Sequence, residues 1–260
     1  MRRSLALIAS VAMTLLLAAP ALAQSVDEIV AKNLQAKGGL DLLRQTTSVK
    51  MTGVFKSFQP SETTMAMTTW AKRPNLVRRE VSVTPPAGQA PPGAPAGPIK
   101  MVQAVDGVSA WIQQGTSAPQ ALPAAQATQV MQDTEFDSVF VDYKSKGLVI
   151  DLVGLEKLNG KDVYHLKVTR KTGPSQHYFL DAQTGLEAKV RTEVSQGASQ
   201  ATVETELSDY RAVEGRMVPF KTRQLVNGQL AAEMTIERVE FNVPMPDTLF
   251  KMPRSVDPGI

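Results

Sequence analysis

The sequence contains no cysteine among its 260 residues. This absence excludes disulfide bonds, a thiol nucleophile, a cysteine metal site and lipid attachment to a cysteine of this chain. Only two histidines are present, and aromatic residues make up 5% of the chain. The folded protein therefore depends on its apolar core alone, and few residues are available for a histidine-based site.

Long apolar runs are also scarce, and the one that exists lies at the N-terminus. Two arginines at positions 2–3 precede an apolar stretch at 5–19, and the small-residue triplet Ala21-Leu22-Ala23 follows. A basic start, a short apolar run and an A-x-A site are typical of a cleaved secretory signal. A membrane anchor is the alternative, but the run is short for a span of about 20 residues. We expect cleavage after Ala23, a periplasmic location, and one soluble domain over residues 24–260.

Neither sign of charge dominates. The chain has 28 basic and 25 acidic residues, and the expected signal contains two of the basic ones and none of the acidic ones. The mature chain would then carry 26 basic and 25 acidic residues, a net charge of +1. This balance gives no indication of nucleic acid or of a strongly acidic partner.

The mature chain is expected to begin with a helix. Ser25-Val26-Asp27-Glu28 has the S-x-x-E form of a capping box. Apolar residues recur at helical spacing as far as Leu34, and Gly38-Gly39 can adopt the left-handed conformation that ends a helix. Residues 40–45 are compatible with another short helical turn.

From about Ser48 onward the apolar pattern changes to a period of two. Residues 186–194 show it best, because apolar residues and one threonine alternate with charged ones, as in a strand with one dry face. Turn signals such as Asn159-Gly160 and Asn227-Gly228 leave links too short for helical crossovers, which predicts an antiparallel sheet. The expected strands lie near 48–58, 63–72, 76–84, 99–105, 108–114, 148–153, 162–171, 175–181, 186–194, 201–211, 216–226 and 230–241.

Two segments interrupt this pattern. Residues 84–98 are rich in proline and glycine, which indicates a surface loop or disordered insert. The alternative is a proline-rich recognition segment that docks in an aromatic groove of a partner protein. Residues 122–133 are rich in alanine and glutamine and predict a helix. Thr134 can cap a second helix. That helix would place four large apolar side chains on one face: Phe136, Val139, Phe140 and Tyr143.

We find no catalytic motif: no G-x-S-x-G, no phosphate-binding loop and no H-E-x-x-H. His165 and His177 lie on neighbouring expected strands and could hold a metal with a carboxylate. Because no ligand cluster accompanies them, we interpret them as solvent-facing strand residues. The sequence thus predicts neither an enzyme nor a cofactor or metal site.

Acidic residues gather around the expected second helix, namely Asp133, Glu135, Asp137 and Asp142. Paired carboxylates can perform acid–base chemistry when their pKa values differ. The positive end of a helix dipole also favours acidic residues, and this explanation suffices for the first three.

Met65 and Met67 share one face of an expected strand because they are two residues apart. Methionine is flexible and polarisable, which suits a surface that accepts apolar groups of varied shape. Ordinary core packing is the alternative interpretation.

Three motifs carry a resemblance to a known family. The string Trp70-Ala71-Lys72-Arg73-Pro74-Asn75-Leu76 (W-x-K-R-P-N-L) resembles a signature of LolA-type periplasmic lipoprotein carriers. Asp106 to Trp111 resembles the D-G-x-x-x-W that follows in that family, and Phe250 to Pro253 resembles its closing F-x-x-P. Only the first motif is specific, although together they span most of residues 27–253.

The resemblance implies a mainly β (α+β) fold, an open antiparallel half-barrel of about eleven strands with a helical lid over an apolar cavity. It also implies cargo of lipidated proteins or lipids, an inner-membrane transporter that loads the carrier, and an outer-membrane acceptor that unloads it. No nucleic-acid binding and no stable membrane insertion are expected.

The resemblance assigns Arg73 as a latch, whose guanidinium would donate hydrogen bonds to carbonyl groups of a lid helix. If Arg73 faces the lid, strand alternation puts Val77 and Val81 on the same side. The expected lipid-binding residues are Met65, Met67, Val77, Val81, Phe136, Val139, Phe140 and Tyr143.

The sequence also departs from the family pattern. Val77 replaces a bulky aromatic residue, Arg78 and Arg79 follow where the family is more apolar, and the 84–98 insert is longer. The alternatives are therefore a carrier of another lipid and a LolA-like lipid-sensing regulator.

Overall fold

The computed structural model describes residues 24–84, 97–196 and 199–254; the expected signal and residues 85–96 of the proline-rich segment lie outside them. The described residues form one antiparallel sheet of 13 strands, in the order β6-β5-β4-β3-β2-β1-β13-β12-β11-β10-β9-β8-β7. The strands are β1 (Ser48–Ser57), β2 (Thr63–Lys72), β3 (Leu76–Val83), β4 (Ile99–Asp106), β5 (Ala110–Gln114), β6 (Gln120–Ala121), β7 (Val149–Leu158), β8 (Lys161–Thr169), β9 (Gln176–Asp181), β10 (Glu187–Gln196), β11 (Ser199–Val213), β12 (Arg216–Val226) and β13 (Gln229–Phe241).

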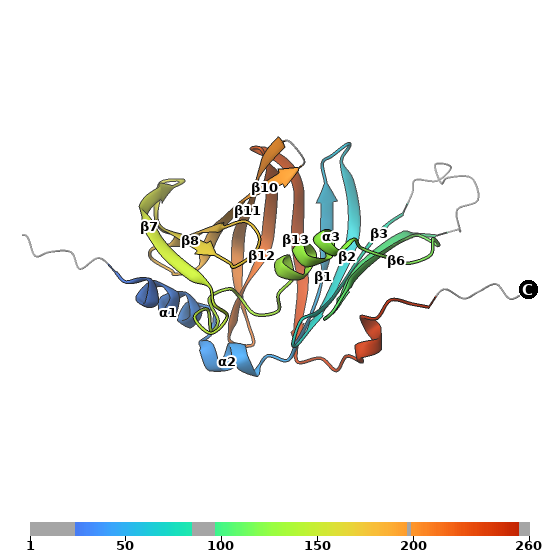
Figure 1. Ribbon diagram of the computed structural model, residues 1–260, viewed down its shortest axis with the longest axis horizontal. Coiled ribbons are helices and arrows are strands. Elements are labelled where there is room, and N and C mark those ends of the chain that lie inside the picture. The colour runs from blue at the N-terminus through green and yellow to red at the C-terminus, as the bar shows by residue number, and fades with distance from the viewer. Residues whose placement is uncertain (1–23, 85–96, 197–198, 255–260) are drawn as a thin grey trace, which may run out of the picture.

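The sheet is open and strongly curved, so the mainly β half-barrel expected from the sequence is confirmed (Figure 1). It has 13 strands rather than about eleven, partly because the two-residue β6 adds to the alternating stretches. Two Asn-Gly pairs turn as expected, with positive φ at both residues: 50° and 82° at Asn159-Gly160, and 50° and 78° at Asn227-Gly228.

Bulges bend the strands of this sheet. The register of β1 on β13 shifts between Thr52 and Gly53. A Cβ atom at Gly53 would lie 2.1 Å from the Thr235 carbonyl oxygen, so only glycine allows the two strands to approach this closely. A second bulge, between Leu152 and Gly154, bends edge strand β7. Such bulges increase local twist and produce the concave face.

The first helix, α1 (Val26–Ala36), begins at the expected capping box. The Glu28 amide donates to the Ser25 hydroxyl (3.3 Å), and the Ser25 amide donates to the Glu28 carboxylate (2.7 Å). Gly38 follows with φ of 120°, and the short helix α2 (Leu40–Gln45) comes next.

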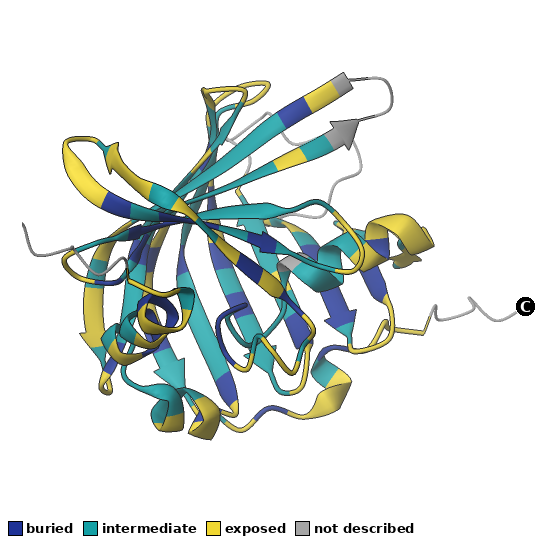
Figure 2. Ribbon diagram, turned by 60° about the vertical axis from the view of Figure 1, so that its left-hand side comes forward, coloured by how far each residue is buried: buried dark blue, intermediate teal, exposed yellow. Residues whose placement is uncertain are grey.

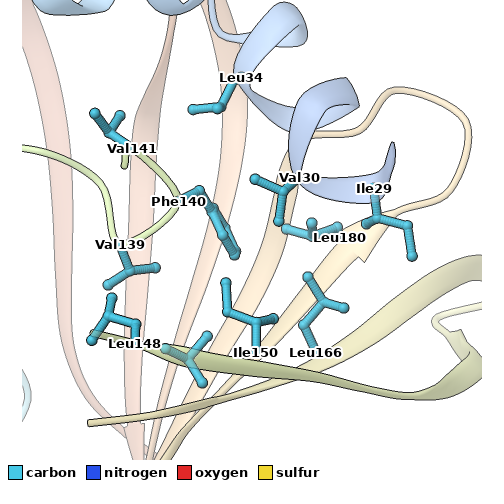
Figure 3. Close-up of a cluster of buried hydrophobic side chains, with 11 residues drawn as sticks. Ile29, Val30, Leu34, Val139, Phe140, Val141, Leu148, Ile150, Leu166 and Leu180 are labelled. Atoms are coloured by element: carbon cyan, nitrogen blue, oxygen red, sulfur yellow. The ribbon is translucent and has the colours of Figure 1, made fainter. Parts of the chain in front are cut away.

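One end of the concave face is closed by α1. Its buried residues Ile29 and Val30 pack with Leu166 and Leu180 of β8 and β9 (Figure 3). Phe140 enters the same core, is 1% exposed, and meets the Tyr178 ring edge-on at 5.1 Å. This cluster is the largest apolar core that the structure describes.

The other end of the concave face is covered by α3 (Ala124–Asp133). Ala127 packs against Val105 and Ala110 of β4 and β5. In Figure 2 most exposed residues lie on the helices and at the strand ends, whereas buried residues follow the strands. The helical lid expected from the sequence is therefore present at both ends of the half-barrel.

The expected second helix after α3 is wrong. Residues 134–148, which we call the covering segment, form consecutive turns, with single bonds such as Val141 N to Ser138 O (3.0 Å) and Lys146 N to Asp142 O (3.1 Å). The four apolar residues do not share one face, because Phe136 is separated from Val139 and Phe140. Side-chain contacts of the segment outweigh its helical pattern.

The outer face of β2–β5 is covered by the chain after β13. Phe250, which follows the 3₁₀ turn η1 (Asp247–Leu249), is fully buried against Leu76 and Met245. The indole nitrogen of Trp111 donates to the Phe250 carbonyl oxygen (2.8 Å). The C-terminal segment is thus part of the fold.

Candidate functional site

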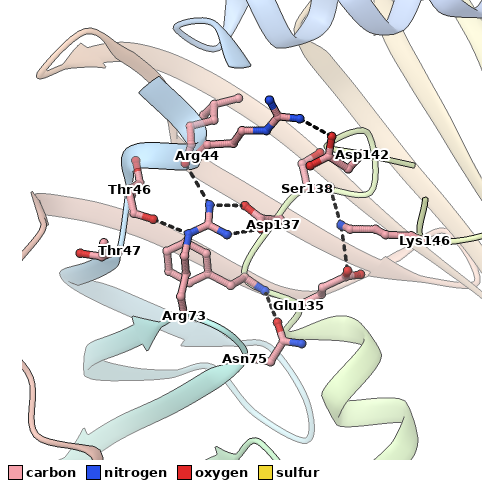
Figure 4. Close-up of polar contacts among 12 residues, drawn as sticks. Arg44, Thr46, Thr47, Arg73, Asn75, Glu135, Asp137, Ser138, Asp142 and Lys146 are labelled. Atoms are coloured by element: carbon pink, nitrogen blue, oxygen red, sulfur yellow. Dashed lines mark hydrogen bonds and ion pairs between the residues drawn. The ribbon is translucent and has the colours of Figure 1, made fainter. Parts of the chain in front are cut away.

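Arg73 lies in the turn between β2 and β3, and its guanidinium joins two parts of the chain (Figure 4). Nε donates to the Thr46 carbonyl oxygen (2.7 Å), and Nη2 donates to that of Leu43 (3.1 Å), at the end of α2. Nη1 and Nη2 also bind the two carboxylate oxygens of Asp137, the latter at 2.7 Å. The guanidinium lies 4.9 Å from the centroid of the Phe136 ring. Arg73 therefore connects the barrel rim to α2 and to the covering segment.

Solvent reaches both partners of this ion pair. The side chains of Arg73 and Asp137 are 28% and 22% exposed. Two-point pairing of guanidinium and carboxylate is stronger than a neutral hydrogen bond. Because both side chains contact solvent, the contribution of the pair to stability stays near the value for exposed ion pairs, about 0–1 kcal/mol, or slightly above it.

Further polar contacts hold the covering segment. The Phe136 amide donates to the side chain of Asn75 (3.3 Å). Glu135 receives Lys146 at 2.8 Å and Arg170 at 3.2 Å. The helix-dipole explanation for Glu135 and Asp137 is therefore wrong, because no helix follows them and both form ion pairs with distant cations.

A cavity of about 220 Å³ lies between the covering segment, α2 and strands β1, β12 and β13. Its apolar walls include Val49, Phe136, Val141, Val218 and Phe241. Small-molecule sites usually measure about 300–1,000 Å³, so a large apolar ligand would need the covering segment to move.

Of the two cations that line this cavity, Lys37 and Arg216, the second holds neighbouring parts of the fold together. Its Nε donates to the Thr46 hydroxyl (2.8 Å), and its guanidinium lies 4.4 Å from the centroid of the Phe241 ring. Arg216 therefore holds α2 against the sheet at the same residue whose carbonyl group binds Arg73.

A second cavity of about 180 Å³ lies further along the concave face. Residues from both walls of the half-barrel line it: Phe55, Met67, Arg79, Thr205, Thr222, Gln224, Ala232 and Met234.

The strand residues expected to bind lipid share the concave face. Met65 pairs with Phe55, Met67 pairs with Val81, and Val77 pairs with Ala71. Met65, Met67 and Val77 are buried, and Val81 is half-buried. Of these, Met67 lines the second cavity.

The residues expected on the lid are separated in space. Phe136 lines the first cavity, whereas Val139 and Phe140 belong to the core under α1. Tyr143 is partly buried beside that core, and its hydroxyl donates to Asp27. The structure thus places one lid residue at a cavity and fixes the other three to the rest of the fold.

Asp137 and Arg79 were not expected at these sites. The alternation that places Val77 and Val81 inside also places Arg79 there, so the signal for Arg79 was present in the sequence. The pairing of Asp137 with Arg73 spans 64 residues, and no local pattern indicates it.

The two histidines were expected to face solvent, and this is wrong for His165, which is 5% exposed. Its Nδ1 is hydrogen-bonded to Glu156 (2.6 Å) and its Nε2 to Nδ1 of His177 (2.7 Å). His165 also stacks on Phe179, with centroids 4.4 Å apart. Desolvation, followed by nearby positive charge, lowers the pKa of His177 below its ordinary value.

Three solved structures share this arrangement of sheet and helices. The LolA superfamily protein NE2245 from Nitrosomonas europaea is 14% identical over 88% of this chain and 98% of its own, with a TM-score of 0.56. A putative outer membrane lipoprotein-sorting protein domain from Vibrio parahaemolyticus is 14% identical over 86% and 95%, with a TM-score of 0.57. The chain has a LolA-like fold.

A DUF1329 family protein from Desulfovibrio piger shares the LolA-like fold as well, at 13% identity over 86% of this chain and 95% of its own, with a TM-score of 0.58. No protein-family model and no curated protein matches the sequence. At these identities the likeness concerns the fold, and function has to be argued from the site.

Within the LolA-like fold, the three sequence motifs meet in space. Trp111 ends D-G-x-x-x-W and donates to Phe250, which begins F-x-x-P. Trp70, at the start of W-x-K-R-P-N-L, packs against the same cluster. Motifs far apart in the sequence therefore form one support on the outer face, behind the Arg73 turn.

Among residues 24–84, 97–196 and 199–254, no helix has the length and apolar character needed to cross a membrane. No group of three or more potential ligands in these ranges is arranged to hold a metal ion.

Proposed function

We propose that this protein is a periplasmic carrier that binds the acyl chains of lipoproteins on its concave face and shuttles them from the inner to the outer membrane. The observation that carries the proposal is the Arg73 junction, which fastens a turn-rich segment over an apolar cavity. The LolA-like fold supports it, since one structure of this fold is described as a lipoprotein-sorting domain.

In this proposal Arg73 is the latch. Breaking its contacts with Asp137, Leu43 and Thr46 costs a few polar interactions and leaves the sheet intact. The part of the covering segment around Phe136 can then move and enlarge the 220 Å³ cavity beneath it. Each methylene of cargo that leaves water contributes about 0.8 kcal/mol, so a single acyl chain offsets the loss of the latch contacts.

The cargo path follows the concave face. Met65, Met67, Val77 and Val81 form its floor, and Met67 reaches the second cavity. Phe136 is the mobile part of the cover. Val139, Phe140 and Tyr143 keep the far end of the covering segment fixed to the core under α1, as a hinge requires.

Export after cleavage at Ala23, loading by an inner-membrane transporter and delivery to an outer-membrane acceptor complete the proposal. We assign no catalytic residue, cofactor or metal. The mass of the protein recovered from a periplasmic extract checks the cleavage site, because removal of residues 1–23 gives a defined loss.

Cargo is tested by purifying the mature protein from the periplasm without detergent, followed by native mass spectrometry and lipid extraction. We expect bound lipopeptide. A different bound lipid would retain the carrier and replace its cargo. A protein that is empty and takes up no acyl ligand in solution would contradict the carrier function.

A carrier of another lipid is the second candidate, and one observation favours it. Arg79 places a cation on a face that otherwise suits uncharged acyl chains. The neutral diacyl end of a lipoprotein offers no partner for that charge.

A further inference from the structure

The second cavity is lined by apolar, neutral polar and positively charged side chains. Phe55, Met67 and Met234 provide apolar walls, as an acyl chain requires. Arg79 projects from β3 into the same space, opposite neutral polar groups on β11 and β12, which are Thr205, Thr222 and Gln224. The lining contains one cation and no carboxylate.

The Arg79 side chain has no hydrogen bond or ion pair to any residue within the described ranges. Its cross-strand neighbours, Thr69 and Gln103, are uncharged. By contrast Arg78, on the opposite face of β3, pairs with Glu80 at 2.6 Å and donates to the Leu249 carbonyl oxygen at 3.1 Å. The guanidinium of Arg78 therefore has partners within the fold, whereas that of Arg79 has none within the described ranges.

The Arg79 guanidinium has no partner in the fold and remains available to a ligand that enters the groove. Arg79 lines the second cavity but is exposed, so its guanidinium reaches solvent at the open mouth of the groove. Desolvation in the groove lowers the pKa of Arg79, although an arginine stays charged at physiological pH. The planar guanidinium presents paired donors that match the two oxygens of a carboxylate or phosphate.

We propose that Arg79 binds the anionic headgroup of an amphiphile, a carboxylate or phosphate attached to an acyl chain that lies along Phe55, Met67 and Met234. The inference rests on the second candidate of the proposed function, a carrier of another lipid, because it assumes that the concave face accepts acyl chains. It adds the chemical class of that lipid. The hydroxyl groups of Thr205 and Thr222 and the amide of Gln224 can complete the shell around the headgroup.

The test compares ligands that differ only at the head. Delipidated protein is titrated calorimetrically with oleate, with oleoyl lysophosphatidate and with methyl oleate, each below its aggregation concentration. Hydrogen bonds to a charged group predict that the protein binds the two anions about tenfold to a hundredfold more tightly than the ester. Acetate and inorganic phosphate, which lack a chain, should show no measurable binding. Tighter binding of oleate indicates a fatty acid, and tighter binding of lysophosphatidate indicates a phospholipid.

Variants of Arg79 test whether this residue causes the preference for anionic ligands. R79Q should remove the preference for anions and leave the affinity for methyl oleate unchanged, and R79K should retain part of it. The matched control is R238Q, because Arg238 is 71% exposed on the outer face and its loss changes the net charge equally. Far-ultraviolet circular dichroism checks that each variant is folded.

The two proposals fail differently. Equal binding of oleate and methyl oleate by the unmodified protein overturns the role of Arg79 and keeps the carrier, and this comparison does not depend on any variant folding. An anion preference that survives in folded R79Q overturns it as well. Failure of all three acyl ligands to bind would instead contradict the carrier function itself.

Discussion

Arg73 and Asp137 form a two-point ion pair across 64 residues of sequence, and this pair fastens the covering segment to the rim of the half-barrel. The same guanidinium binds two carbonyl groups at the end of α2. Within the turn, Asn75 accepts a hydrogen bond from the Phe136 amide, and Arg73 makes the contacts with Asp137 and with α2. Removal of the Arg73 side chain should affect opening of the segment more than folding.

Replacing Arg73 with leucine should change the free energy of unfolding by at most about 2 kcal/mol, since the side chain is partly exposed. Amide hydrogens of the covering segment should exchange faster, and cargo capture or release should be impaired. Hydrogen exchange and a cargo-transfer assay measure these effects. The control is R44L, which removes the more exposed pair with Asp142. Unchanged exchange and transfer in R73L would exclude the latch.

Glu187 is 5% exposed and forms an ion pair with Lys37 at 2.8 Å. Burial alone would raise the pKa of Glu187, but the charge and hydrogen bond of Lys37 outweigh it and lower that pKa. E187Q leaves Lys37 without its partner. We expect a loss of about 2–3 kcal/mol, at or below the lower end of the range for a broken buried pair, because Lys37 can still reach solvent.

Urea denaturation measures this loss, and E193Q, on an exposed position of β10, is the control. A similar small effect of both variants would show that the buried pair does not stabilise the link between α1 and the sheet.

The lowered pKa of His177 makes folding depend on pH. In the unfolded chain this histidine binds a proton near its ordinary pKa of about 6.5, whereas in the folded chain it does so only at lower pH. Its contribution is complete above that ordinary pKa and is lost as pH falls below it. The urea midpoint should therefore decrease between pH 7.5 and 5.5, and H177Q should show a smaller decrease. An equal decrease in both proteins would assign the effect to other groups.

Phe250 is fully buried on the outer face. F250A should lower the free energy of unfolding by about 3–5 kcal/mol, the usual cost of removing a buried phenylalanine ring. Tryptophan fluorescence should shift to longer wavelength as Trp111 loses its cover. M252A is the matched control, because Met252 is 43% exposed. A loss below about 1 kcal/mol in F250A would mean that the C-terminal segment is dispensable for the fold.

Sequence patterns succeeded where the deciding interactions are local. The capping box at Ser25 and Glu28, the period of two in residues 186–194 and the Asn-Gly turns depend on neighbours within a few residues. The same alternation put Val77 and Val81 on one face. Arg79 belongs to that face by the same rule. That it shares a cavity with residues of β11 and β12 follows only from the tertiary structure.

Patterns failed where distant residues compete with local preference. Residues 134–143 have the spacing of an amphipathic helix, yet Asp137 turns to Arg73, Phe136 turns to the first cavity, and Phe140 enters the core under α1. His165 is part of an alternating strand, but Glu156, His177 and Phe179 bury it.

The sequence by itself therefore determined the antiparallel strands, the first and third helices and the motif that places Arg73 at a strand end, because these depend on periodicity and turn chemistry. Only the tertiary structure decided that the covering segment is not helical, that Asp137 is the carboxylate that closes it, and that the Arg79 side chain lies unpaired in a groove with both apolar and polar walls. The physical reason is that ion pairs and apolar burial join residues whose separation in sequence leaves no local trace.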